Sequence, residues 1–273
     1  MNYILIDGSY FIFYRFFALL NWWKLSHKDE PIGKAHENIE FIDKFRSIVI
    51  KKIQEIPKKL DIDNPIIIVG KDCKRENIWR RNIYPEYKQT RVSYTDTDDI
   101  HPGEFFKIVY EEELFTQAGC HYCVKHPQLE ADDCIALTTK YLLNKQPTDL
   151  NNDTHITIIT SDTDYLQLIQ PNVRVMNCKY KSVNTAKNSF GCCEKDLLCK
   201  IIMGDKSDNI PAILKKCGPK TASKYIENPS LLQNKLSTDV EIRKKYNLNK
   251  LLIDFREIPN ELQREFLDIL PQI

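Results

Sequence analysis

Carboxylate residues follow four short apolar runs of the sequence, each at the point where the run ends. They are, in chain order, Asp7; Asp72; Glu130, Asp132 and Asp133; and Asp162 and Asp164. So many like charges at close quarters repel one another unless cations neutralise them. Because the ligands are oxygen atoms, Mg²⁺ or Mn²⁺ is favoured over zinc. Two such ions, roughly 3.5–4 Å apart, activate water for in-line displacement at phosphorus, so the pattern predicts phosphodiester hydrolysis.

Each acid on its own also has a structural explanation. Asp7 and Asp162 could cap helices. Asp132 or Asp133 could stand in the first turn of a helix, where the helix dipole favours negative charge. Taken singly, these residues favour capping. Taken together, at successive strand ends, they favour metal binding.

The apolar runs that precede the acids predict β-strands. The expected strands are Tyr3–Ile6, Pro65–Val69, His121–Val124, Ile156–Thr160 and Val173–Met176. Between them, Ile39–Ile56, Phe105–Ala118 and Ala131–Leu143 have apolar residues at helical spacing. Strand and helix in alternation predict an α/β fold with a mainly parallel central sheet flanked by helices. Ligands of such a sheet bind outside the carboxyl ends of its strands, so we expect the acids to converge there.

After about Phe190 the strand pattern stops and the chain is expected to be helical. The expected helices are Glu194–Met203, Thr221–Ile226, Asp239–Tyr246 and Asn260–Leu270. The 273 residues, 42% hydrophobic and 28% charged, have the composition of a folded globular protein. The apolar stretch around Tyr10–Leu20 contains Arg15 and is too short to span a bilayer. With no secretion signal and nine cysteines, an odd number, we expect an intracellular protein, cytoplasmic or nuclear, with reduced thiols and no membrane partner.

The net charge of +1 hides two basic regions. Bases outnumber acids between Lys71 and Arg91, a stretch that includes Arg80 and Arg81. A second group precedes an expected helix, where backbone N–H groups and the close approach that Gly218 allows form a phosphate site. The candidates there are Lys216, Gly218, Lys220 and Thr221. Segregated basic regions around an acidic pocket are typical of a nucleic-acid enzyme, although solvated surface faces are the alternative.

Five stretches, in order along the chain, resemble the flap endonuclease and 5′–3′ exonuclease family. They are ILIDGSYFIFYRFFA from Ile4, IWRRNIYPEYKQTR from Ile78, LEADDCIA from Leu129, ITSDTDYLQLI from Ile159, and MGDKSDNIP with CGPKTASKYI from Met203. The family includes phage nucleases and the nuclease part of bacterial DNA polymerase I. The resemblance implies a PIN-like nuclease domain over residues 1–190, with a helical arch near 80–118. It also implies a helical, duplex-binding helix-three-turn-helix module over residues 191–273.

The resemblance also implies roles for particular residues. The metal-site acids would be Asp7, Asp72, Glu130, Asp132, Asp133, Asp162, Asp164, Asp205 and Asp208, with Asp7, Asp133 and Asp162 central to catalysis. Lys88 would touch the scissile phosphate with help from Arg91, and Tyr87 could stack on a base or simply pack. Relatives carry a monovalent cation, expected to be K⁺, in the helix-three-turn-helix loop.

The sequence departs from the family pattern at two places. The second strand usually ends in a metal-binding aspartate, whereas IIIVGKDC has Gly70 at the ungapped position. Asp72 therefore serves only if the turn is rearranged. The hairpin PAILKKCGPKTA keeps only Gly218 of the usual glycines and is longer by a residue, so its phosphate-binding geometry is expected to differ.

The leading hypothesis is a structure-specific 5′-nuclease that binds two Mg²⁺ ions, for which Mn²⁺ can substitute. It would act as a monomer on branched or 5′-ended DNA and leave a 5′ phosphate and a 3′ hydroxyl. A PIN-type RNA nuclease and a non-catalytic DNA-junction binder are the alternatives. Two cysteine groups raise the question of zinc: Cys120, Cys123 and His126, and Cys192, Cys193 and Cys199. Neither has the second Cys pair of a zinc site, so zinc is not expected.

Overall fold

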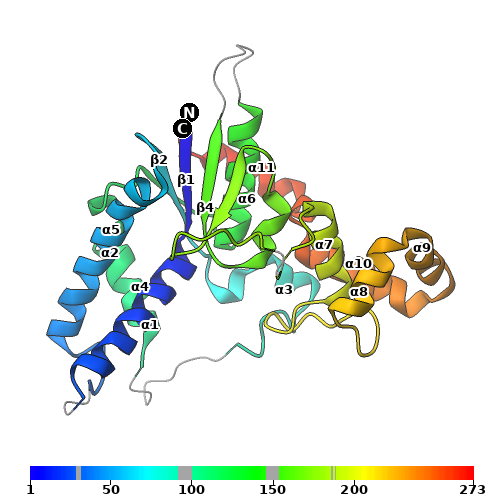
Figure 1. The fold of residues 1–273 in the computed structure, drawn as a ribbon, viewed down its shortest axis with the longest axis horizontal. Coiled ribbons are helices and arrows are strands. Elements are labelled where there is room, and N and C mark those ends of the chain that lie inside the picture. Colours follow the sequence, from blue (N-terminus) through cyan, green and yellow to red (C-terminus); the bar gives the residue numbers. More distant parts are fainter. Residues whose placement is uncertain (29–31, 92–99, 146–153, 186, 188) are drawn as a thin grey trace.

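A computed structural model describes residues 1–28, 32–91, 100–145, 154–185, 187 and 189–273. Its centre is a parallel sheet with the strand order β3-β2-β1-β4-β5 (Figure 1). The strands are β1 (Asn2–Asp7), β2 (Ile66–Gly70), β3 (Tyr122–Val124), β4 (His155–Ile159) and β5 (Val173–Met176). All five predicted strands and the predicted fold class are confirmed.

Helices cover both faces of the sheet because successive residues of each strand point to opposite sides. Ile4 and Ile6 of β1 pack with α1 (Gly8–Ser26) and α2 (Ile39–Leu60). Leu5 lies in a second core with residues of α6 (Ala131–Asn144) and α11 (Asn260–Ile269). Strands buried on both faces read as continuous apolar runs, which is why the sequence marks them clearly.

The predicted helix over 105–118 is two helices in the structure. They are α4 (Pro102–Glu111) and α5 (Leu114–Gln117), separated where Glu113 adopts a left-handed φ of 53°. Two short elements, η1 (Arg75–Asn77) and α3 (Trp79–Ile83), precede the basic turn that ends at Arg91. The range 80–118, in which an arch is expected, contains most of α3 together with α4 and α5, and its residues 92–99 lie outside the described part of the chain.

The helices beyond β5 extend to one side of the sheet in Figure 1. They are α7 (Cys193–Met203), α8 (Pro219–Glu227), α9 (Pro229–Thr238), α10 (Val240–Ile253) and α11. The sequence did not predict α9. The last helix returns to the sheet, since Leu262 and Phe266 of α11 pack against the core that contains α6. The division of the chain at residue 190 stays a prediction, and α11 packs with the α/β part.

Candidate active site

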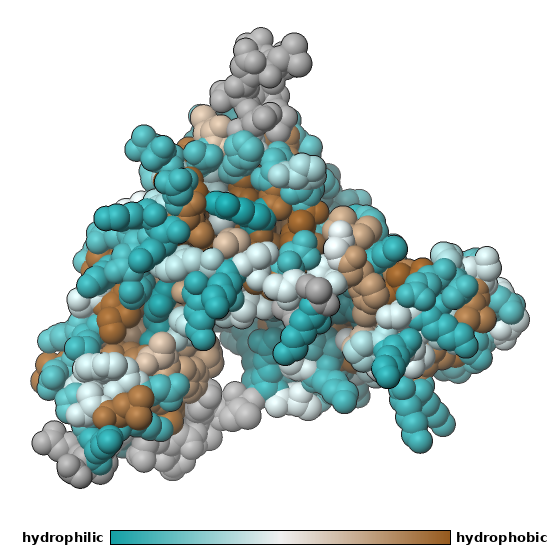
Figure 2. Space-filling view, viewed as in Figure 1, coloured by the Kyte–Doolittle hydropathy of each residue, from teal (hydrophilic) through white to brown (hydrophobic). Residues whose placement is uncertain are grey.

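The carboxyl ends of the strands open into a cavity of about 710 Å³. Six of the nine predicted acids line it: Asp7, Asp72, Glu130, Asp132, Asp162 and Asp205. Lys88, Arg91 and Lys200 lie on the same wall. Figure 2 shows the molecule hollowed between the arm that contains α1 and the helices beyond β5, with largely hydrophilic surface along the rim. Acids that are distant in sequence therefore meet, as the strand-end pattern predicted.

Asp7 both caps a helix and lines the cavity. Its Oδ1 accepts a hydrogen bond from the backbone N–H of Tyr10 at the start of α1. Its Oδ2 lies 3.2 Å from the Tyr165 hydroxyl and 3.3 Å from Thr160 Oγ1. Burial, and then the nearby Asp72 carboxylate, raise the pKa of Asp7 to about 7. The capping and metal-site interpretations of this residue are thus compatible.

Asp72 reaches the cavity from the loop after β2. Its Oδ1 accepts from the backbone N–H of Ala131 at 2.6 Å, and its Oδ2 accepts from the Ser9 hydroxyl. Burial, and then Glu130, raise the pKa of Asp72. At Gly70 a Cβ atom would stand 2.8 Å from the Ala131 carbonyl oxygen, so no side chain fits without a shift of the backbone. The loop after β2 thus brings Asp72 to the cavity of the acids, and its role as a metal ligand stays a prediction.

Glu130 and Asp133 form a reciprocal cap at the start of α6. Asp133 has no exposed surface, and both of its oxygens accept hydrogen bonds of 2.7 Å from Arg80. The Trp79 indole also donates to it, at 3.0 Å. Asp133 thus lies behind the cavity wall, where it orients Arg80 and the backbone of Glu130. A direct metal bond from Asp133 stays a prediction.

Two predicted DNA contacts need correction. The Arg80 side chain is 2% exposed, because its guanidinium donates to Asp133, Glu130 and the Leu252 carbonyl oxygen. Tyr87 is also 2% exposed. Its hydroxyl lies 3.0 Å from Glu130 and 3.2 Å from Asp208. Both residues support the site from inside the protein and cannot reach a nucleic acid in this structure.

Lys88 lies at the boundary of the cavity and faces Glu130. Its Nζ is 2.5 Å from Glu130 Oε1 and 3.6 Å from Asp208 Oδ2. Burial alone would raise the pKa of Glu130, but Lys88 and Arg80 lower it. Burial likewise would lower the pKa of Lys88, but Glu130 raises it. Both groups are therefore charged at neutral pH.

A second group of acids surrounds Lys200 of α7. The sequence analysis predicted these acids but did not identify Lys200. Its Nζ lies 3.0 Å from Asp205 and forms an ion pair with Asp164, while Asp162 is 4.0 Å away. Burial alone would raise the pKa of Asp205, but Lys200 and Ser207 lower it to about 2. Lys200 stands directly before the IIMGDKSDN stretch, five residues before Asp205, and this closeness in sequence was the available signal.

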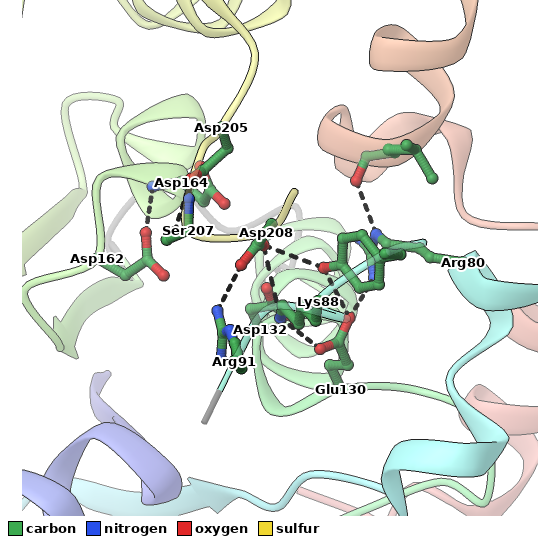
Figure 3. A network of polar contacts seen from close by, with 12 residues as sticks. Arg80, Lys88, Arg91, Glu130, Asp132, Asp162, Asp164, Asp205, Ser207 and Asp208 are labelled. Carbon is green, nitrogen blue, oxygen red and sulfur yellow. Dashed lines mark hydrogen bonds and ion pairs between the residues drawn. The ribbon is translucent and has the colours of Figure 1, made fainter. Parts of the chain in front are cut away.

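Asp208 connects the two groups of acids. Arg91 Nη2 lies 2.5 Å from its Oδ1, opposite the oxygen that faces Tyr87 and Lys88. Figure 3 shows Asp208 between the Glu130 side of the site and the Asp162, Asp164 and Asp205 side. The loop that carries Asp205 and Asp208 thus joins the helical part to the α/β part at the cavity.

The donor chemistry fits divalent metal ions. The described residues contain two sets of three carboxylates in which one oxygen of each residue lies within 4.8 Å of the others. The sets are Glu130, Asp132 and Asp133, and Asp164, Asp205 and Asp208. Burial, together with Asp133 and Glu130, raises the pKa of Asp132 well above its usual value. This repulsion is what a bound cation would relieve. Both sets consist of carboxylates alone.

Aromatic side chains also line the cavity. Phe13 and Tyr10 of α1 and Phe106 of α4 line it, and the Phe13 and Phe106 rings are 5.6 Å apart in an edge-on arrangement. Phe13 is 39% exposed, although it stands in the middle of a largely buried helix. This surface was also missed, because in the sequence Phe13 is one of many apolar residues of the same run.

The predicted phosphate-binding hairpin lies between α7 and α8. Gly218 caps α8, and Pro219 follows at its first position, where the missing N–H costs no hydrogen bond. Lys216 adopts a φ of 55°, a conformation that glycine usually supplies. The backbone N–H of Thr221 is directed to the Gly218 carbonyl at 3.0 Å, and Lys220 lies exposed in the first turn of α8. The roles of these four residues and of Arg81 in DNA binding stay predictions.

Comparison with known proteins identifies the class to which this fold and site belong. The family model of the 5′-3′ exonuclease N-terminal resolvase-like domain matches residues 2–195. A 5′-3′ exonuclease of Buchnera aphidicola subsp. Acyrthosiphon pisum (strain APS) is 28% identical over 235 residues, which are 85% of this chain and 72% of that protein. Ribonuclease H of Enterobacteria phage T4 is 27% identical over 235 residues, 80% of this chain and 73% of that protein.

The solved structures give the same fold. The T5 5′-exonuclease with bound divalent metal ions has a TM-score of 0.67 at 17% identity, over 98% of this chain and 97% of that one. The chain belongs to the 5′-3′ exonuclease family, and the predicted family and 5′-nuclease activity are confirmed. Its acids provide a site for divalent metal ions. Among the described residues, none of the helices has the length and apolar character that crossing a bilayer requires.

Proposed function

We propose that the protein hydrolyses DNA phosphodiesters at 5′ flaps and free 5′ ends with two Mg²⁺ ions, leaving a 5′ phosphate and a 3′ hydroxyl. The observation that carries the proposal is the cavity in which acids from four strand ends and from the loop before α8 face Lys88 and Arg91. One neighbour, the T5 D15 flap endonuclease, has been solved with DNA and metal ions. When bound, divalent ions at such a site activate water and stabilise both oxygens of an in-line displacement.

The chain's own residues supply the rest of the proposed chemistry. Glu130, Asp132 and Asp72 would hold one ion, and Asp162, Asp164 and Asp205 the other, with Asp7 and Asp208 nearby. Lys88 and Arg91 bring positive charge to the place where negative charge grows on the phosphate. Phe13 and Phe106 offer a face for a nucleobase. The hairpin before α8, with Lys216, Lys220 and an expected K⁺, would hold the duplex phosphates independently of sequence.

The test is cleavage of a labelled 5′-flap DNA with and without Mg²⁺. We expect Mn²⁺ to substitute for Mg²⁺ and EDTA to abolish cleavage. The variant Asp162→Ala should lower the rate at least about 100-fold, whereas Asp268→Ala, which removes an exposed acid on α11, should leave it unchanged. Cleavage that survives EDTA or the loss of Asp162 would overturn the proposal.

An RNA-cutting enzyme is the second candidate, since the phage T4 relative is called ribonuclease H. The comparison of matched flaps whose 5′ strand is DNA or RNA decides between the two. Faster cleavage of the RNA strand would assign the protein to RNA removal. A protein that binds both flaps but cleaves neither in Mg²⁺ or Mn²⁺ would instead be a junction binder.

A further inference from the structure

The turn that carries Lys88 and Arg91 has no regular element to hold it in place. It runs from Tyr84 to Arg91 after the short helix α3. Within it, Lys88 adopts a left-handed φ of 56°, which a residue with a side chain rarely takes unless its surroundings impose it. The orientation of the Lys88 side chain into the cavity therefore depends on contacts from outside the turn.

One side of the turn is held by the loop that carries Asp208. The backbone N–H of Lys88 donates to the Asp208 carbonyl oxygen at 2.9 Å. The Asn209 side-chain amide donates to the Glu86 carbonyl oxygen at 3.0 Å. These bonds fix the distance between the turn and the second group of acids, but they leave the opposite edge of the turn to another partner.

That partner is Arg75 of η1. Its Nη2 donates to the Lys88 carbonyl oxygen at 2.6 Å and lies 3.3 Å from the Gln89 carbonyl oxygen. Nη2 carries two N–H groups, so this one nitrogen can donate to two adjacent carbonyl oxygens. Arg75 lines a smaller cavity of about 430 Å³ that shares Asp72, Glu130 and Lys88 with the cavity of the acids, but Arg75 does not line the cavity of the acids itself.

We propose that Arg75 is a positioning residue, which clamps the backbone of the Lys88 turn against the Asp208 loop and so sets the orientation of Lys88 and Arg91 toward the phosphate. The proposal rests on the proposed function, since the reaction whose rate it affects is the same. Arg75 acts through the turn and not on the substrate. Its loss should therefore slow the chemical step while leaving DNA affinity nearly unchanged.

The variant Arg75→Ala tests this, with Arg264→Ala, the same substitution at an exposed arginine of α11, as the matched control. We expect the single-turnover rate on a 5′ flap to fall roughly 10- to 100-fold, as for a modest misplacement of a catalytic group. The dissociation constant in Ca²⁺ should change by less than about twofold. Arg75→Lys, which keeps a positive charge on a long side chain, should restore only part of the rate. The control Arg264→Ala should cleave at the wild-type rate.

A double variant separates positioning from other roles. If Arg75 acts through Lys88, Arg75→Ala should add little to the loss already caused by Lys88→Ala. If the rate loss of the double variant equalled the product of the two single-variant losses, the proposal would be overturned. It would also be overturned if the loss appeared in the dissociation constant, with the dependence of log K on log salt reduced by about one, because that is the mark of a direct phosphate contact.

Hydrogen exchange gives a readout that does not need activity. The Lys88 amide, which donates to Asp208, should exchange at least about tenfold faster in Arg75→Ala than in Arg264→Ala, without a change in exchange in the central strands. Unchanged exchange would overturn the clamp. Should Arg75→Ala lower Tm markedly, Arg75→Gln replaces it under the same criteria. If wild type cleaves no flap, the proposed function fails, while the exchange rates still decide whether Arg75 holds the turn.

Discussion

At the scale of single residues, the active site contains carboxylates that repel one another unless cations are bound between them. Asp7 is buried next to Asp72, and it is kept in place by the N–H of Tyr10 and the hydroxyl of Tyr165. A pKa raised from 3.8 to about 7 corresponds to roughly 4 kcal/mol of destabilisation once the carboxyl group ionises. The ionised Asp7 therefore lowers the free energy of unfolding of the metal-free protein.

The substitution Asp7→Asn should therefore stabilise the metal-free protein and abolish cleavage. Because the folded pKa lies above the unfolded value, the cost of Asp7 is absent at low pH, grows between about pH 4 and pH 7, and is constant above that range. Urea unfolding in EDTA should show a clear gain for Asp7→Asn at pH 8, of up to about 4 kcal/mol, and a much smaller gain at pH 5. Equal gains at the two pH values would contradict this account.

The corrected residues show which contacts a sequence does not reveal. Arg80 and Tyr87 stand among basic residues in a motif that the family resemblance places near DNA, so contact with the substrate was predicted, with packing as the alternative for Tyr87. The structure buries both, because Asp133 and Glu130 require partners inside the protein. Whether an arginine serves an internal carboxylate or an external phosphate depends on side-chain direction in a short helix, and spacing alone does not determine it.

At the scale of elements, β1, β2 and β4 were predictable because they are short and largely buried on both faces. The acids at their ends were predictable for the same reason, since the end of a parallel strand fixes where the next residues lie. The break between α4 and α5 was not, because Glu113 adopts a left-handed conformation that its residue type does not signal. The sequence analysis also did not predict α9, which begins at Pro229, a residue that suits the first turn of a helix.

The hairpin before α8 carries a prediction about salt. The paired substitution Lys216→Ala and Lys220→Ala should weaken duplex binding to all sequences alike and reduce the slope of log K against log salt by about two. The rate at saturating DNA should change little, since neither lysine lines the cavity of the acids. The measurement is fluorescence anisotropy in Ca²⁺ at several salt concentrations, with Lys140→Ala of α6 as the control. Sequence-dependent loss would contradict the assignment.

At the scale of the whole molecule, the site spans two parts of the chain. Glu130 and Asp132 belong to the α/β part, whereas Asp205 and Asp208 stand on the loop that leads into the hairpin. Ions bound between them would tie the helical part to the sheet. Without metal, Lys88, Arg91 and Lys200 make the corresponding ion pairs.

Divalent ions should accordingly stabilise the folded protein. At 100 times the dissociation constant a ligand that binds only the folded state contributes about 2.7 kcal/mol. For a chain of this length we expect Mg²⁺ or Ca²⁺ to raise Tm by roughly 5 °C or more at pH 8. Differential scanning calorimetry with and without EDTA measures the shift. Asp205→Asn should reduce it and Asp268→Ala should not; an equal shift in both variants would place the bound ions elsewhere.

The crowding around Gly70 has a consequence for how this site can vary. An aspartate at that strand end would collide with the first turn of α6, so the second-strand carboxylate has to come from the loop two residues later. The glycine at position 70 and the aspartate at position 72 therefore depend on each other. A variant with an aspartate at position 70 would need α6 to move, and a position-by-position sequence comparison would record a missing carboxylate although Asp72 brings one to the same cavity.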